Sequence, residues 1–156
     1  MESVQETDIA KLDLFEAIAS QPSDAIIFAG RNGAIRVWSR GAETIFGYSA
    51  AEVLGKSLDI IIPDRLRRAH WDGFRRAIDT GETKLGGRLL VTRSAHKSGR
   101  KLYVELSFGL VRDRDSTVIG AFAIGRDCTA RYDADKALSA RIAQLEKLVP
   151  PDNAQA

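Results

Sequence analysis

The chain has 156 residues and a mass of 17.1 kDa, enough for one domain with a buried core. Hydrophobic residues make up 44% and charged residues 28%, which excludes an intrinsically disordered chain. The net charge of +2 does not indicate a nucleic-acid partner. The single cysteine excludes an intrachain disulfide, and no apolar run reaches the ~18 residues of a membrane span. The polar start lacks the pattern of a signal peptide, so we expect a cytoplasmic protein without a membrane partner.

The first part of the chain predicts a helix, a hairpin and two short helices. Apolar residues at helical spacing indicate a helix over residues 8–20, which Pro22 ends. Asn32-Gly33 lies between two apolar segments, and this pair is typical of a β-hairpin because both residues tolerate positive φ. A short helix over 40–46 follows, and Ser49 with Glu52 forms a capping box that begins another, which ends at Gly55.

The second part predicts one longer helix, three strands and a final helix. The longer helix spans 64–80, and the strands span 85–95, 102–112 and 118–126, joined by loops of hairpin length. Apolar residues alternate with others through 102–110, as in a strand with one buried face. The final helix spans 130–149 and carries a short seam of coiled-coil spacing made of Leu138, Ile142, Leu145 and Val149. The order predicts an α+β fold with helices on one face of a five-stranded antiparallel sheet.

Several motifs at matching separations resemble the PAS domain family. The most specific stretch is similar to the family pattern W-N-x-x-A-x-x-x-[FL]-G-Y-x-x-x-E-x-x-G. It consists of Trp38-Ser39-Arg40-Gly41-Ala42-Glu43, Ile45-Phe46-Gly47-Tyr48, Glu52 and Gly55, with Ser39 in place of the usual Asn. Gly99 and the run Arg126-Asp127-Cys128-Thr129 resemble two further elements of the family. The resemblance implies a PAS domain over 24–129. Together with the helical patterns on either side of it, this predicts an N-terminal flanking helix over 1–23, a C-terminal signalling or dimerisation helix over 130–149 and a disordered tail over 150–156.

Within this family, the segments 62–74 and 80–82 resemble a haem-binding branch. That branch includes the sensor modules of bacterial carbon-monoxide-responsive transcription regulators and, more distantly, oxygen-sensing histidine kinases. The resemblance implies a haem b cofactor whose iron is ligated by a histidine on the long central helix, which is His70 by position. Some relatives add a methionine ligand, but the chain has no methionine after Met1.

A helical projection places His70 on the inward face of the long helix. At about 100° per residue, His70 lies between Leu66 and Phe74, opposite most of the arginines of this helix. A buried imidazole needs a hydrogen-bond partner or a metal, and the residues alone allow both. The arginine-rich face is interpreted as a solvated helix surface rather than a nucleic-acid site.

The expected pocket lies between the long helix and the last two strands. Its apolar lining is predicted to include Leu66, Phe74, Leu106, Phe108, Ile119 and Ala121. Arg88 or Arg93 could meet the haem propionates, because arginine binds carboxylates well. His96 is expected in an exposed turn, and Cys128 is expected to act as a small buried apolar residue. Because this lining offers no second iron ligand and no distal hydrogen-bond donor, unless Arg88 or Arg93 swings in, we expect a five-coordinate ferrous haem that binds carbon monoxide readily and oxygen less stably.

The resulting hypothesis is a sensory domain rather than an enzyme, since no spacing suggests a catalytic set. It would bind a diatomic gas (CO, O₂ or NO) or report a redox change, and pass the signal to the final helix or to a downstream signalling protein. The chain would then be an excised module or a stand-alone sensor acting through a partner. A homodimer is expected through Ile9, Leu12 and Phe15 and through Leu138, Ile142 and Leu145. Two alternatives are a cofactor-free interaction module and a pocket for a small organic ligand.

Overall fold

The structure, a computed structural model, describes residues 14, 16–21 and 23–148. Residues 14 and 16–20 are helical. The later elements are, in chain order, β1 (Ala25–Gly30), β2 (Ile35–Trp38), α2 (Arg40–Phe46), α3 (Ala50–Val53), the 3₁₀ helix η1 (Leu58–Ile61), α4 (Asp64–Thr80), β3 (Leu90–Ser94), β4 (Leu102–Arg112), β5 (Val118–Asp127) and α5 (Thr129–Glu146). The predicted α+β class is confirmed: the five strands form one antiparallel sheet in the order β2-β1-β5-β4-β3.

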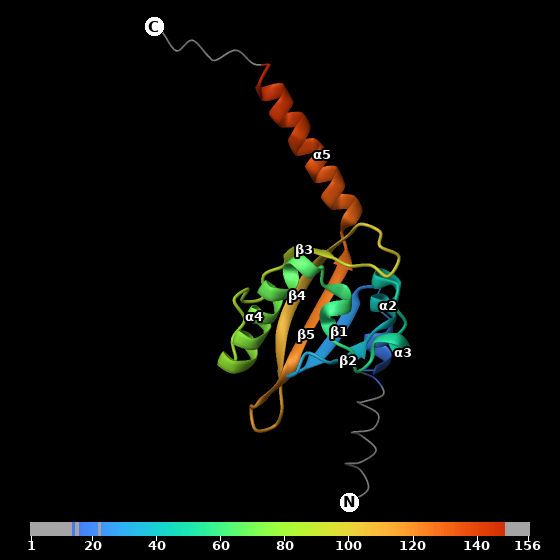
Figure 1. Cartoon of the computed structure of the whole chain (residues 1–156), viewed down its shortest axis with the longest axis vertical. Helices are drawn as coiled ribbons and strands as arrows, with labels where there is room; N and C mark the ends of the chain where they lie inside the picture. Colours follow the sequence, from blue (N-terminus) through green and yellow to red (C-terminus); the bar gives the residue numbers. More distant parts are fainter. Residues whose placement is uncertain (1–13, 15, 22, 149–156) are drawn as a thin grey trace, which may run out of the picture.

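One face of the sheet is buried beneath the helices that connect β2 to β3 (Figure 1). Alternate residues of β1 and β4 point into this core, as the period of a half-buried strand requires. They are Ala25, Ile27 and Ala29 of β1 and Leu102, Val104 and Leu106 of β4. The helical layer contributes buried side chains to the same core, including Phe46, Val53, Leu58 and Ile61.

Helix α4 packs against the turn between β1 and β2. Gly33 donates its N–H to the Gly30 carbonyl oxygen at 2.8 Å and has a φ of +76°, a conformation that favours glycine. A Cβ at Gly33 would lie 2.2 Å from the ring of Trp71, so the turn makes room for this aromatic side chain of α4. The Trp71 Nε1–H donates to Asp59 Oδ1 at 2.7 Å, which ties α4 to η1 as well.

Both ends of α4 are also fixed by arginines. Near its start, Arg67 donates to the Asp59 and Ile62 carbonyl oxygens at 3.1 and 3.2 Å. At its end, Gly81 adopts a φ of +72° and its carbonyl oxygen accepts from Arg112 of β4 at 2.8 Å. These contacts determine which face of α4 is presented to the sheet.

The short helices are capped as the motifs predict. Ser39 accepts from the Ala42 N–H at 3.2 Å and from the Ile26 N–H at 2.8 Å, so it caps α2 and ties that helix to β1. The predicted capping box at the start of α3 is present. Its carboxylate, Glu52, also pairs with Lys97, and the Lys97 ammonium together with the Ser49 hydrogen bonds lowers the pKa of Glu52 to about 2.

The strand expected over residues 85–95 is shorter than predicted. It begins at Leu90, because Gly86 and Gly87 adopt φ values of +51° and +81° in a turn. Backbone hydrogen bonds from Gly86 to Thr83 and from Arg88 to Leu85 close that turn. The later start of β3 and its pairing with β4 determine which of its side chains face the core.

Helix α5 extends away from the rest of the domain (Figure 1). Leu138, Ile142 and Leu145 of the predicted seam are exposed, and Val149 lies outside the described residues. The N-terminal residues Ile9, Leu12 and Phe15 also lie outside them, so the homodimer expected through both groups stays a prediction. Within the part of the chain that the structure describes, no helix is long and apolar enough to cross a membrane.

Candidate functional site

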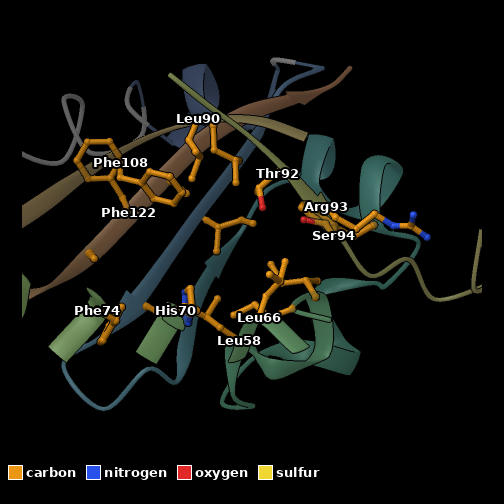
Figure 2. A pocket seen from close by; sticks show the side chains of 18 of the residues that line it. Leu58, Leu66, His70, Phe74, Leu90, Thr92, Arg93, Ser94, Phe108 and Phe122 are labelled. Atoms are coloured by element: carbon orange, nitrogen blue, oxygen red, sulfur yellow. The ribbon is translucent and has the colours of Figure 1, made fainter. Parts of the chain in front are cut away.

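A cavity of about 340 Å³ lies between the sheet and α4 (Figure 2). This volume falls in the range of small-molecule sites, roughly 300–1,000 Å³. The cavity-lining residues of β1 and β5 include three alanines, Ala29, Ala121 and Ala123, whose short side chains leave space beneath the helix. The apolar lining comes from β1, η1, α4 and β3–β5, and includes Ile27, Ala29, Leu58, Ile61, Ile62, Leu66, Phe74, Leu90, Leu106, Phe108, Ala121 and Ala123.

His70 of α4 belongs to the lining of this cavity. Its Nδ1 is enclosed by protein and has no hydrogen-bond partner among the described residues. The ring packs edge-on against Trp71, with 4.9 Å between ring centroids, and stacks on Phe74 at 6.1 Å. These contacts restrict the orientation of the imidazole without satisfying its nitrogen.

The environment of His70 favours the uncharged ring. Burial lowers the pKa of His70 below its ordinary value, and the Asp59 carboxylate opposes this effect. The imidazole is therefore neutral near physiological pH, and a neutral imidazole is the form that ligates a metal.

Most of the apolar residues expected around His70 line the same cavity. They are Leu66 and Phe74 on α4, Leu106 and Phe108 on β4, and Ala121 on β5. The antiparallel register brings the strand residues together, since Ala121 pairs with Leu110, and Phe108 pairs with Ala123.

The expected position of Ile119 in this lining is wrong. The pairing of β4 with β5 shifts by one residue, because Val111 pairs with Gly120 and Arg112 pairs with Val118. Ile119 is the extra residue of this bulge, so the alternation that places Ala121 inward does not extend to it. Its side chain is 40% exposed and lines a separate shallow hollow with Phe28.

Neither of the two expected arginines directs its guanidinium into the cavity. Arg88 is exposed in the turn before β3, where its Nε donates to the Leu85 carbonyl oxygen at 3.3 Å. Arg93 borders the cavity, but its guanidinium carbon lies 5.6 Å from the ring centroid of Tyr103. Figure 2 shows this side chain directed away from the cavity. The expected contact with haem propionates therefore has no support in the observed side-chain positions.

Two polar cavity residues, Thr92 and Ser94, were not among those expected. Both lie on β3 and line the cavity. The expectation of a lining without a hydrogen-bond donor is therefore wrong, because each residue brings a hydroxyl group. The alternation of Leu90, Thr92 and Ser94 is visible in the sequence, but its direction depends on where β3 begins.

The other candidate ligands lie elsewhere. His96 lines a neighbouring polar hollow with Arg65 and Arg100, and its Nδ1 is 2.9 Å from Ser98 Oγ. Cys128 is buried at the start of α5, and burial raises the pKa of its thiol. No cluster of three or more His, Cys, Asp or Glu side chains suited to a metal occurs in the described ranges.

Replacing His70 with leucine tests whether the imidazole lowers the free energy of unfolding of the ligand-free protein. An enclosed polar atom without a partner costs about 1–3 kcal/mol, and leucine also favours the helix. We expect His70→Leu to raise the free energy of unfolding of the ligand-free protein by about 1–3 kcal/mol, measured by urea denaturation. The control His96→Leu removes a histidine that has a hydroxyl partner and should not stabilise the protein. A destabilised His70→Leu variant would instead assign the imidazole a structural role.

Comparisons with known proteins identify the family of this chain. The model of the PAS fold matches residues 13–128. The chain is 24% identical over 106 residues to the oxygen sensor protein DosP of Escherichia coli and 25% identical over 123 residues to the sensor protein FixL of Bradyrhizobium diazoefficiens. These matches cover 68% and 79% of this chain, but only 13% of DosP and 23% of FixL.

A solved PAS domain from Colwellia psychrerythraea has the same fold. It superposes with a TM-score of 0.67 at 23% identity, covering 76% of this chain and 98% of that domain. Because the family model spans more than half of the sequence and a solved PAS domain has the same fold, this chain belongs to the PAS fold family, whose members are generally sensory modules of signalling proteins.

Proposed function

We propose that this domain binds haem b through His70, senses a diatomic gas or a redox change, and passes the signal through its C-terminal helix. One observation carries the proposal: the neutral imidazole of His70 lines a largely apolar cavity, and its Nδ1 has no hydrogen-bond partner among the described residues. Haem would supply an iron centre that binds small gases and changes its oxidation state.

The residues around the cavity suit a flat, apolar macrocycle. Leu66 and Phe74 flank His70 along α4, while Leu106, Phe108 and Ala121 belong to the opposing sheet. The packing of Trp71 and Phe74 against the imidazole restricts its orientation, so that His70 would be held in place to ligate the haem iron. The similarity to DosP, which is named as an oxygen sensor protein, supports the same class of signal.

A continuous set of contacts offers a route from the cavity to α5. Arg93 borders the cavity on β3 and stands over Tyr103 of β4 on the other face of the sheet. The Tyr103 ring stacks on Tyr132 of α5, with 3.7 Å between centroids and 12° between planes. The Tyr103 N–H also donates to Thr129 Oγ1 at 2.9 Å. We propose that displacement of β3 by a bound ligand shifts this stack and thereby the start of α5.

Ion pairs hold the same junction on both sides of the tyrosine stack. Arg131 of α5 pairs with Glu105 of β4 at 2.6 Å, and Lys101 pairs with Asp133. The first turns of α5 are therefore coupled to β4, whereas the later residues of the helix are exposed. A partner or a second copy of the chain would bind the exposed later residues of α5 and respond to their change in position.

The cofactor is tested by reconstitution. Wild-type protein mixed with one equivalent of haem should develop a Soret band, and His70→Ala should abolish stoichiometric binding while circular dichroism shows a folded domain. His96→Ala is the matched control and should bind haem like the wild type. If the wild type binds no haem, the proposal fails, and a small organic ligand or a cofactor-free interaction role is favoured. Unchanged binding by His70→Ala would exclude His70 as the ligand.

The relay is tested by hydrogen exchange of α5 with and without haem. In the wild type, we expect haem to change the protection of residues 129–133, because the tyrosine stack joins them to β4. Tyr132→Ala should retain the Soret band but lose this change in protection. Lys136→Ala, which alters an exposed residue of the same helix outside the predicted seam, should respond like the wild type. A full response in Tyr132→Ala would contradict the route through the stack.

A further inference from the structure

Strand β3 presents two different faces, and its inward face becomes more polar along the strand. Leu90, Thr92 and Ser94 pair with Leu106, Val104 and Leu102 of β4, which are all buried on the core side of the sheet. The alternation of a strand therefore directs these three β3 side chains inward. The intervening Arg93 instead lies over Tyr103 on the outer face.

The two hydroxyl groups on this inward face have no assigned partner. Ser94 is only 7% exposed, and Thr92 is partly buried. Both line the cavity that contains His70, and neither hydroxyl forms a hydrogen bond within the described residues. Because both residues line the cavity and their hydroxyls have no protein partner among the described residues, the hydroxyls are free to donate to a ligand held there.

The hydroxyls and the imidazole lie on different sides of the cavity. Figure 2 shows Thr92 on the β3 side, across the cavity from His70 on α4. A small molecule held near His70 would meet apolar side chains on most sides and hydroxyl donors on the β3 side. The arrangement suits a ligand that has one electronegative atom directed away from His70.

We propose that Thr92 and Ser94 form a hydrogen-bonding site that selects among the gases bound in this cavity. The inference rests on the proposed haem function and adds its ligand preference. A strong hydrogen-bond acceptor such as oxygen gains from these donors, whereas carbon monoxide, a weak acceptor, gains little. The domain therefore favours oxygen relative to carbon monoxide more than an entirely apolar pocket would.

The test compares gas affinities of the haem-reconstituted, reduced protein. Thr92→Val and Ser94→Ala remove one hydroxyl each with little change in shape. At least one of them should lower oxygen affinity by about two- to tenfold, the equivalent of one neutral hydrogen bond, and change carbon monoxide affinity less than twofold. The same variant should shift the infrared stretching band of added carbon monoxide to higher frequency. Thr92→Ser retains its hydroxyl and should behave like the wild type.

The controls separate this inference from the haem proposal. Ser107→Ala removes a hydroxyl that donates to the Ile124 carbonyl oxygen on the outer face of the sheet, and it should change neither affinity. If the variants bind haem but leave the oxygen-to-carbon-monoxide ratio and the infrared band unchanged, the hydroxyl site is refuted and the haem proposal stands. Loss of haem uptake in a folded variant would also overturn the inference, because the hydroxyls would then hold the cofactor. Absence of haem binding in the wild type overturns both.

Discussion

The contact of Trp71 with the β1–β2 turn determines how α4 lies over the sheet. The indole occupies space that only a glycine at position 33 leaves open, and its N–H bonds to Asp59 of η1. Because Trp71 follows His70 directly in the helix, fixing the indole also fixes the direction of the imidazole. Arg67 and Arg112 hold the two ends of the helix in the same orientation. The cavity and its histidine therefore depend on contacts made outside the cavity.

The cavity combines an apolar lining with polar groups that the protein leaves unsatisfied. Native proteins satisfy most buried polar atoms, so exceptions call for an explanation in function. Here the one such enclosed atom among the described residues is the Nδ1 of His70 on α4. Thr92 and Ser94 of β3 line the same cavity with hydroxyls that are open to it rather than enclosed by protein. A ligand between α4 and β3 would contact the imidazole ring on one side and the two hydroxyls on the other. Arg93, between the two hydroxyl residues, connects the same strand to the junction with α5.

Much of the fold could be predicted from local patterns. The Asn32-Gly33 turn, the capping motifs and the alternation in β4 each have a short-range physical cause. All three are consistent with the same fold. The helical projection placed His70 toward the core for the same reason. The residues of β4 that line the cavity followed from strand periodicity alone.

The errors arose where distant pairing overrides local pattern. Ile119 left the expected face because β4 and β5 pair with a bulge, and no local signal in the sequence marks it. The Gly86-Gly87 turn delayed the start of β3, so the inward side of Thr92 and Ser94 was not evident. Arg93 turned outward toward Tyr103, a cross-strand partner that only the register reveals. The positions of Ile119 and Arg93 required knowledge of which strand residues are paired, whereas the Gly86-Gly87 turn is a local signal that the sequence already contained.

The central claim is that His70 ligates the haem iron, and resonance Raman spectroscopy tests it most directly. The chain has two histidines, so a His96→Gln variant labelled with ¹⁵N-histidine carries the label at His70 alone. The account predicts a five-coordinate, high-spin ferrous spectrum with an iron–histidine stretching band that shifts to lower frequency on labelling. A band that does not respond to the label would contradict ligation by His70, and a six-coordinate, low-spin spectrum would contradict the expectation that no second residue reaches the iron.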